Sequence, residues 1–331
     1  TQTDAGESDN TFTFTLKDNT KADNYKIELV PGKLKVTPIS DKVTVTITGN
    51  SDTKPYNGEK QSVKDYKVEI SNKLYNENCF SFNGSAVAEG TDAGTYMMGL
   101  KAEQFKNTSK NFTNVVFAVT DGKLEISQRS VIMTSASDEK FFDGEPLTND
   151  TVTVTGDGFI EGEGASYDVT GTQTKTGESD NTFRYKLNDN TKADNYKIEV
   201  AFGKLVVKQL LEKEEHFNYV VGYPDGTIRP EGKITRAEVA AIFFRLLTDD
   251  ARAEFDCRDN DFTDVEDGAW YNRSISTLAK AGILSGYLDG TFKPNAPITR
   301  AEMASIIARF DKLTETGKTF NDIEGHWAQK Y

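Results

Sequence analysis

The feature that most constrains the fold of this chain is an internal repeat. Residues 1–36 recur at 172–207, where 26 of 36 aligned positions are identical, including the runs GESDNTF and DNTKADNYKIE. A more diverged copy lies between them, and its PYNGE at 55–59 aligns with FFDGE at 141–145. Self-similarity of this kind predicts a series of like modules. We expect the second half of a module at 1–38 and complete modules at 41–127 and 129–209.

Alternating apolar and polar residues run through each copy. Val43, Val45 and Ile47 alternate with threonines, and residues 12–16 show the same pattern. A period of two places one face of a strand on a core and the other in water. Asn-Gly and Asp-Gly pairs between the strands are typical of hairpin turns. With no helical stretch between them, these strands predict small, antiparallel, sandwich-like all-β repeats.

Charge and composition exclude several classes of partner. The 331 residues carry a formal net charge of −13 and a pI near 4.8. Nucleic acids and anionic membranes are bound through basic faces, so we expect neither. No apolar run approaches the roughly 18 residues of a membrane helix, so we expect no membrane insertion. Cys79 and Cys257 lie in different predicted domains, which disfavours both a mutual disulfide and a metal site.

The sequence changes character near Lys208. A charged connector, KQLLEKEEHF, follows, the apolar period becomes helical, and eight of the ten arginines lie beyond residue 210. After this connector the same segment occurs twice, at 221–247 (the first repeat) and at 285–310 (the second repeat). Such a shift marks a domain boundary. We expect an α-helical region with a shortened domain at 212–250, a complete one at 260–312 and the start of a third at 320–331.

Both repeats contain the string ITRAE, which specifies a helix start. Thr235 and Thr299 are placed to be N-caps, and the glutamate three residues later completes a capping box. The capping box does not explain Arg236 and Arg300, because a cation at the first helical position is mildly unfavourable. A guanidinium beside free backbone N–H groups suits a carboxylate or phosphate. The alternative interpretation is an ordinary surface ion pair.

The helices of this region should each bury one apolar face. We expect Phe243 in the first repeat and Ile307 in the second to lie on that face. Ahead of the second repeat, residues 262–284 predict an extended segment and then a helix that buries Ile275 and Leu278.

The C-terminal repeats resemble S-layer homology (SLH) domains, whose pattern is an F-x-D-V segment, a Trp, a helix, a GYPDGTFRP turn and an ITRAE helix start. The β-repeats resemble the YDG or MBG-type modules of bacterial surface proteins, a family without a general enzymatic activity. The SLH resemblance implies three units around a pseudo-threefold axis, with grooves that bind secondary cell-wall polysaccharide, often through a pyruvate ketal. Carried over to this sequence, the implied binding residues are Arg236, Arg300, Thr235, Thr299, Asp264, Trp270, Gly222, Gly286, Asp322 and Trp327. A Trp can stack on a sugar face, and a Gly allows close approach of a ligand to the backbone.

The sequence departs from the SLH pattern in three places. The first repeat lacks the F-x-D-V segment and its Trp, Leu288 stands where the turn usually has Pro, and the ITRAE string of a third unit is absent from this sequence. We therefore expect a fragment with an incomplete set of units and a low affinity for polysaccharide of its own.

Other candidate sites have simpler interpretations. The acidic string at 256–264 lacks the Gly and the final Glu of an EF-hand loop, so a solvated linker is expected. His216 and His326 have no evident catalytic or metal-binding partner, and no carboxylate pair stands out for glycosidase chemistry. We expect no enzymatic activity, no cofactor and no metal.

The resemblance thus implies an extracellular wall anchor with a β-stalk in a Gram-positive-type bacterium. Three alternatives stay open. The β-repeats could bind an external ligand as an adhesin, the chain could be the accessory region of an enzyme whose catalytic domain lies upstream, or it could belong to an S-layer lattice.

Overall fold

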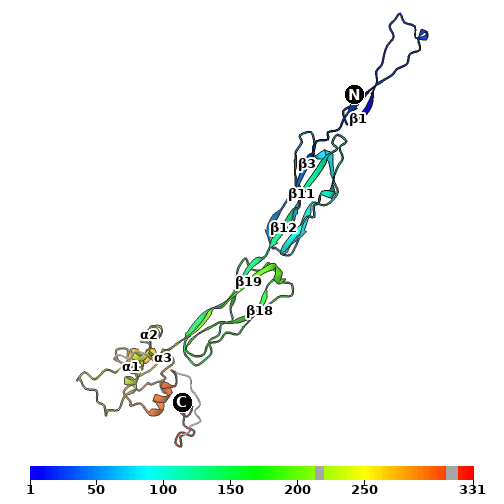
Figure 1. The fold of residues 1–331 in the computed structure, drawn as a ribbon. Coiled ribbons are helices and arrows are strands. Elements are labelled where there is room, and N and C mark those ends of the chain that lie inside the picture. The colour runs from blue at the N-terminus through cyan, green and yellow to red at the C-terminus, as the bar shows by residue number, and fades with distance from the viewer. Residues whose placement is uncertain (213–219, 311–319) are drawn as a thin grey trace. The chain divides into compact units, whose positions relative to one another are not determined.

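The computed structural model describes residues 1–212, 220–310 and 320–331 (Figure 1), so His216 lies outside the described residues. By its contacts the chain divides into two compact units. One comprises residues 1–131, 156–164 and 187–198, and the other comprises residues 132–155, 165–186 and 199–331. Small β-sheets occupy the N-terminal region and α-helices follow after residue 235, which confirms the predicted multidomain fold class.

The β-module at 41–127 is built around β3 (Val43–Gly49), which lies between β11 (Val115–Thr120) and β6 (Tyr66–Ile70). Val43, Val45 and Ile47 of β3 are fully buried, as their alternation with threonines predicts. A second sheet places β12 (Lys123–Ser127) between β4 (Asp52–Pro55) and β9 (Gly94–Met97). The shorter elements are β5 (Gln61–Lys64), η2 (Glu77–Cys79), β7 (Phe80–Phe82), β8 (Val87–Gly90), η3 (Ala102–Gln104) and β10 (Phe105–Asn107).

Strand direction corrects one detail of the predicted β-fold. Strand β11 runs parallel to β3, and β12 runs parallel to β4, so the sheets are mixed rather than purely antiparallel. Alternation of apolar residues fixes which face of a strand is buried, but it carries no information about the direction of the neighbouring strand.

The β-module at 129–209 repeats this arrangement. Its strand β20 (Lys204–Lys208) lies between β14 (Asp138–Phe141), which is parallel to it, and β17 (Gly177–Asp180), which is antiparallel. The same directions hold for β12 between β4 and β9. The remaining elements are β13 (Arg129–Ser135), β15 (Val152–Gly156), β16 (Ala165–Val169), β18 (Phe183–Leu187), η4 (Ala193–Asn195) and β19 (Tyr196–Ala201).

The N-terminal half-module, residues 1–36, keeps only a portion of this fold. Strand β1 (Gly6–Asn10) pairs with β2 (Gly32–Val36), and η1 (Ala22–Asn24) lies between them. Residues 12–16, expected as a strand, form none, and Phe12 and Phe14 are 54% and 46% exposed. Their counterpart β18 pairs with β16, and residues 1–36 contain no counterpart of β16.

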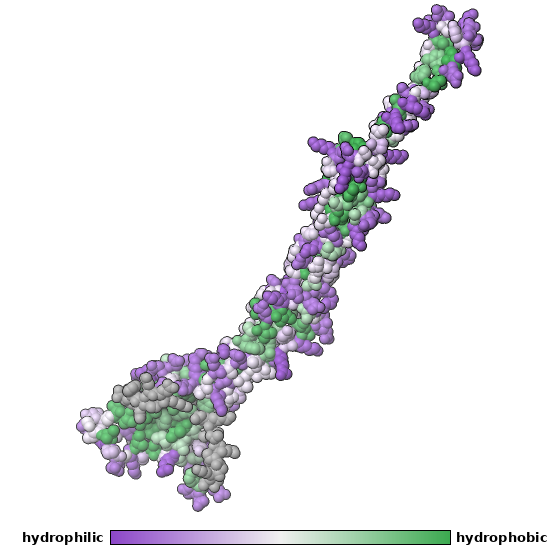
Figure 2. All heavy atoms as spheres, in the orientation of Figure 1, coloured by the Kyte–Doolittle hydropathy of each residue, from purple (hydrophilic) through white to green (hydrophobic). Residues whose placement is uncertain are grey.

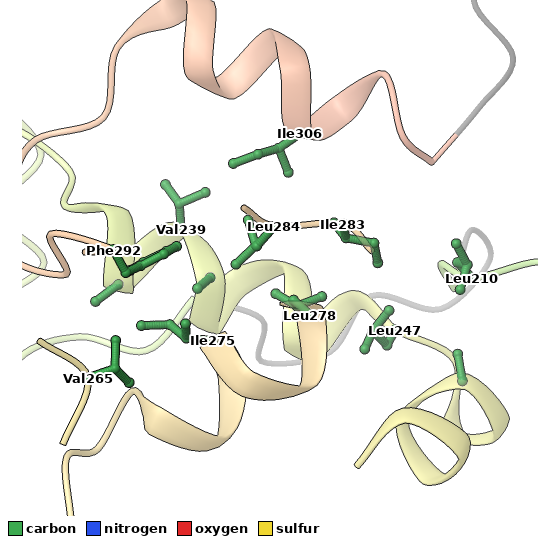
Figure 3. Packing of buried hydrophobic residues seen from close by; sticks show 13 residues of the cluster. Leu210, Val239, Leu247, Val265, Ile275, Leu278, Ile283, Leu284, Phe292 and Ile306 are labelled. Atoms are coloured by element: carbon green, nitrogen blue, oxygen red, sulfur yellow. The ribbon is translucent and has the colours of Figure 1, made fainter. Parts of the chain in front are cut away.

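The C-terminal region packs its helices around one apolar core. The helices are α1 (Arg236–Leu246), α2 (Asp249–Phe255), α3 (Asn272–Lys280) and α4 (Arg300–Ile307). Figure 3 shows Val239 of α1, Leu278 of α3 and Ile306 of α4 pointing toward a shared interior. Ile275 and Leu278 are buried as predicted, but the prediction for Ile307 is wrong, because it is 54% exposed and Ile306 is buried instead. A turn of about 100° separates neighbouring positions on a helix, and the apolar pattern could not choose between these two isoleucines.

Apolar side chains also lie at the surface of the helical region. Figure 2 shows hydrophobic residues beside hydrophilic ones there, and Trp270, Leu288 and Ile307 are among the exposed apolar residues. Within the described ranges, no helix combines the length and the apolar character needed to cross a membrane.

Candidate functional site

The two ITRAE helix starts have the same capping geometry. In α1 the amide of Glu238 donates to Thr235 Oγ1 at 3.2 Å, and the amide of Thr235 donates to Glu238 Oε2 at 2.8 Å. In α4, Thr299 and Glu302 form the same pair of bonds at 3.2 and 2.8 Å. The predicted capping boxes are confirmed. These bonds commit Thr235 and Thr299 to their helices.

A tyrosine that the sequence analysis did not single out completes each helix start. Tyr223 Oη donates to Glu238 Oε1 at 2.7 Å, and Tyr287 Oη donates to Glu302 Oε1 at 2.6 Å. Burial by itself would raise the pKa of each glutamate, but the hydrogen bonds from tyrosine and threonine outweigh it and lower the pKa of both. The recurring Gly-Tyr pair ahead of each Asp-Gly turn was the available sequence signal.

Arg236 lies in the interface between the two repeats. Its Nη1 forms an ion pair with Glu302 Oε1 at 2.8 Å, and its Nε donates to the carbonyl of Phe292 at 2.7 Å. Its Nη2 donates to the carbonyl of Ser285 at 3.3 Å, and the guanidinium lies over the rings of Tyr287 and Phe292. The residue is only 6% exposed. These contacts correct the interpretation of Arg236 as a ligand-binding residue, because its donors already serve the second repeat.

The second repeat also covers the N-terminus of α1. The amides of Arg236 and Ala237 donate to the carbonyls of Ala296 and Pro294, both at 2.9 Å. These are two of the N–H groups that a helix start leaves without an intrahelical partner. The backbone amides of Arg236 and Ala237 are therefore not free to bind an anion.

Arg300 occupies the equivalent position in α4 but has a different environment. It is exposed, and within the described portion of the chain neither its guanidinium nor the amides of Arg300 and Ala301 have a hydrogen-bond or ion-pair partner. The start of α4 therefore combines an accessible guanidinium with free amides at the positive end of a helix dipole. This combination suits a carboxylate or phosphate.

Asp264 and the two turn glycines support the fold of the turns. Asp264 accepts the amides of Phe292 and Lys293 through its two carboxylate oxygens, each at 2.7 Å. A Cβ at Gly286 would lie 2.5 Å from Phe262 Cε1, and a Cβ at Gly222 would lie 2.8 Å from the carbonyl oxygen of Thr227. Close packing inside the protein thus accounts for both glycines without a ligand. The two amide hydrogen bonds likewise account for Asp264 without a ligand.

The two tryptophans are accessible. Trp270 is 64% exposed and makes an edge contact with Tyr271, and Trp327 is 54% exposed and lies beside His326. Asp322 is exposed as well. Among the described contacts, no hydrogen bond or ion pair therefore engages the side chains of four of the ten predicted binding residues, namely Arg300, Trp270, Trp327 and Asp322.

Two further places in the structure are weaker candidates for a site. A cavity of about 460 Å³ is lined by residues 142–145, by Gly282 and Ile283, and by Arg309, which donates to the carbonyl of Ile283 at 2.6 Å. None of the predicted binding residues lines it. In the acidic string at 256–264, Asp256 pairs with Arg273 at 2.8 Å, and no cluster of the described His, Cys, Asp and Glu residues could hold a metal ion.

Comparison with known proteins identifies both kinds of repeat. The S-layer homology domain matches residues 217–240 and 261–304, and the MBG domain matches residues 42–128. A cellulosome-anchoring protein of Acetivibrio thermocellus is 41% identical over 124 residues, which is 35% of this chain and 28% of that protein. Cell surface glycoprotein 1 of the same organism is 39% identical over 130 residues, 35% of this chain and 6% of its own length. Exoglucanase XynX, also from A. thermocellus, is 36% identical over 109 residues, 32% of this chain and 10% of its own length. The chain thus spans less than a third of the length of each of these relatives.

Proposed function

We propose that this chain, which carries an MBG domain and S-layer homology repeats, holds a bacterial surface protein non-covalently to secondary cell-wall polysaccharide, with its β-modules as a stalk. The observation that carries the proposal is the exposed helix start at Arg300 within an S-layer homology match. Relatives named as a cellulosome-anchoring protein and a cell surface glycoprotein support a place at the cell surface of a Gram-positive-type bacterium.

The proposed site lies at the start of α4. A sugar carboxylate, such as that of a pyruvate ketal, accepts hydrogen bonds from the Arg300 guanidinium and from the amides of Arg300 and Ala301. Trp270 and Trp327 offer exposed faces on which a sugar ring can stack. Arg236 serves this site indirectly, because it holds the second repeat against the first.

A competing role for Arg300 follows from the environment of Arg236. The carbonyls and the glutamate of the following repeat surround Arg236, and a further repeat could cover Arg300 in the same way. The two roles predict different results. If Arg300 binds the polysaccharide, its substitution weakens the binding of this chain to the wall. If Arg300 instead contacts a further repeat, its substitution leaves that binding unchanged.

Co-sedimentation of the whole chain with purified cell-wall sacculi tests the proposal. Loss of a charge-assisted hydrogen-bond pair should weaken the binding of Arg300→Ala by about tenfold or more. Arg258→Ala is the matched control, because Arg258 is an exposed arginine of the same region away from a helix start. Circular dichroism checks that each variant is folded. Equal sedimentation of wild type and Arg300→Ala would contradict the site, and equal binding to sacculi stripped of polysaccharide by hydrofluoric acid would contradict the ligand.

A second candidate is the accessory region of a surface enzyme. The match to exoglucanase XynX, over 10% of that protein's length, favours it, because the remainder of that relative lies outside the match. In this case the anchoring chemistry is the same, and we propose that the described residues themselves catalyse nothing. Incubation of the chain with cellulose, xylan and starch should release no reducing sugar, and a measurable release would overturn this second proposal.

A further inference from the structure

Two joints between consecutive β-modules in the first compact unit use the same pair of hydrogen bonds. At the first joint, the amide of Ala5 donates to Asn111 Oδ1 at 2.6 Å, and Asn111 Nδ2 donates to Asp4 Oδ1 at 2.9 Å. At the second, the amide of Ala93 donates to Asn195 Oδ1 at 2.7 Å, and Asn195 Nδ2 donates to Asp92 Oδ1 at 3.0 Å. One asparagine amide thus uses both its acceptor and its donor on an Asp-Ala pair of the preceding module.

The residues on each side of these joints share a local sequence. The Asp-Ala pairs belong to Thr-Asp-Ala-Gly turns at 3–6 and 91–94, which we name the TDAG turns. Each asparagine precedes a buried aromatic residue, Phe112 or Tyr196, and we name these the Asn–aromatic pairs. The recurrence of both partners at two joints indicates a rule of assembly, because an accidental contact would not reproduce the same two bonds.

Further contacts strengthen the second joint. Lys192 Nζ forms an ion pair with Asp92 Oδ2 at 2.7 Å, and Tyr56 packs edge-on against Tyr196 at a centroid distance of 5.6 Å. Glu163 accepts both tyrosine hydroxyls, at 2.7 and 2.8 Å. Asn195 is completely buried, so its amide is costly to leave without partners. The TDAG turn therefore supplies partners that the Asn–aromatic pair needs.

A third Asn–aromatic pair, Asn24–Tyr25, lies in the half-module. Residues 21–28 are identical to residues 192–199, so Lys21 corresponds to Lys192. The backbone at Tyr25, with φ −133° and ψ 136°, matches that at Tyr196, with φ −130° and ψ 138°. Yet Asn24 is exposed and Tyr25 is 62% exposed. The conformation of the site is thus already formed in the absence of a partner.

The TDAG turn is altered in one copy. Residues 172–183 repeat residues 1–12 except that Lys175 and Thr176 replace Asp4 and Ala5. The local fold is kept, because Gln173 Nε2 donates to the carbonyl of Lys175 at 2.7 Å, as Gln2 does to that of Asp4. A lysine cannot accept the asparagine N–H and would repel a lysine at the position of Lys192. This copy belongs to the β-module that the helical region follows.

We propose that Asn24 and Tyr25 form a docking site for the TDAG turn of a further β-module of the same kind, and that Lys175 ends the series of joints. The occupant is defined by the joints already formed: both use an Asp-Ala pair, and the second adds a tyrosine, Tyr56. Lys21 would pair with the incoming aspartate, as Lys192 pairs with Asp92. The inference concerns assembly of the stalk and does not depend on polysaccharide binding.

The rule is tested first in the chain as it exists. Hydrogen exchange of the Ala93 amide should become about 5–10-fold faster in Asn195→Ala, while exchange of Ala5 stays unchanged. In Asn111→Ala we expect the reverse result, in which hydrogen exchange of the Ala5 amide becomes faster and that of the Ala93 amide stays unchanged. Each variant therefore contains its own control. Unchanged exchange of Ala93 in Asn195→Ala would overturn the rule.

The free site is tested by adding its partner. Duplication of residues 41–171 directly ahead of Thr1 restores the order found at 41–207 and places a second copy of Asp92 opposite Asn24. A 3-fluorotyrosine at position 25 distinguishes this site from the identical segment at 192–199. We expect its ¹⁹F resonance to move toward that of labelled Tyr196 and to lose its solvent-isotope shift.

The matched control carries Asp92→Lys in the added copy only, which imitates Lys175 and still completes the half-module. With this change, or with Asn24→Ala, the ¹⁹F resonance should stay apart from that of Tyr196. Identical resonances in the extended chain with and without Asp92→Lys would overturn the proposal.

Discussion

Removal of the Arg236 side chain tests whether this arginine is structural. It forms a nearly buried ion pair with Glu302, in which the two side chains are 7% and 16% exposed. Loss of one partner of a buried pair costs about 3–5 kcal/mol. Glu302 keeps hydrogen bonds from Tyr287 and Thr299, which places Arg236→Ala toward the lower end of that range. Loss of the contacts with the Tyr287 and Phe292 rings adds about 0.5–2 kcal/mol.

Urea unfolding followed by circular dichroism at 222 nm reports on the helical region. With a slope of about 1–1.5 kcal/mol per molar urea, a loss of about 3–5 kcal/mol lowers the midpoint by about 2–5 M. Because such a loss can unfold the region altogether, Arg236→Lys is the milder variant. An ammonium keeps the charge facing Glu302 but cannot reach the carbonyls of Phe292 and Ser285 at the same time, so we expect a loss of about 1–3 kcal/mol.

Arg300→Ala is the internal comparison, since the same substitution is made at the same position of a like helix. Arg300 is exposed, so its removal should change the free energy of unfolding by no more than about 0.5 kcal/mol. Equal midpoints for Arg236→Ala and Arg300→Ala would refute the assignment of Arg236 as the link between the repeats.

Three further predictions follow from single contacts. Asp264→Ala removes the acceptor of two amides and should cost the helical region about 2–3 kcal/mol in the urea assay, whereas exposed Asp267→Ala should be neutral. Gly286→Ala should lower the melting temperature, because its Cβ would lie 2.5 Å from Phe262, whereas Gly268→Ala has open space and should not. Burial, followed by the hydrogen bond to Glu163, raises the pKa of Tyr56 to about 12. Burial also raises the pKa of Tyr196 to about 12, where the hydrogen bond from the Ile160 amide lowers the pKa and the hydrogen bond to Glu163 raises it. Neutral tyrosines therefore stabilise this joint below pH 10, and that contribution should be lost as the pH rises through about 12. Tyrosinate absorbance at 295 nm should show Glu163→Gln lowering both pKa values without moving that of Tyr75, which burial also raises to about 12.

The features that the sequence predicted well depend on neighbouring residues. The alternation in β3 needs only the period of a strand, and Thr235 meets Glu238 within one turn of α1. These signals survive in any context that keeps the local backbone. They predicted the buried face of β3 and both capped helix starts.

The features that the sequence could not predict depend on residues far away in the chain. The parallel partner of β3 is β11, about seventy residues later, and residues 12–16 form no strand although their counterpart β18 pairs with β16. The acceptors of Arg236 lie 49, 56 and 66 residues later. No local pattern contains that information.

The arginine of the ITRAE string stands at an unfavourable helix position in both repeats, and its surroundings decide its role. At the start of α1 the unfavourable helix dipole is offset by Glu302 and by the carbonyls of Phe292 and Ser285, which supply the negative charge that the position needs. At the start of α4 the described residues supply no negative charge, so the Arg300 guanidinium is available to an anionic or carbonyl partner. Either a sugar carboxylate or a further repeat can be that partner. Weaker binding of Arg300→Ala to sacculi at an unchanged urea midpoint would indicate the sugar, and unchanged binding would indicate the repeat.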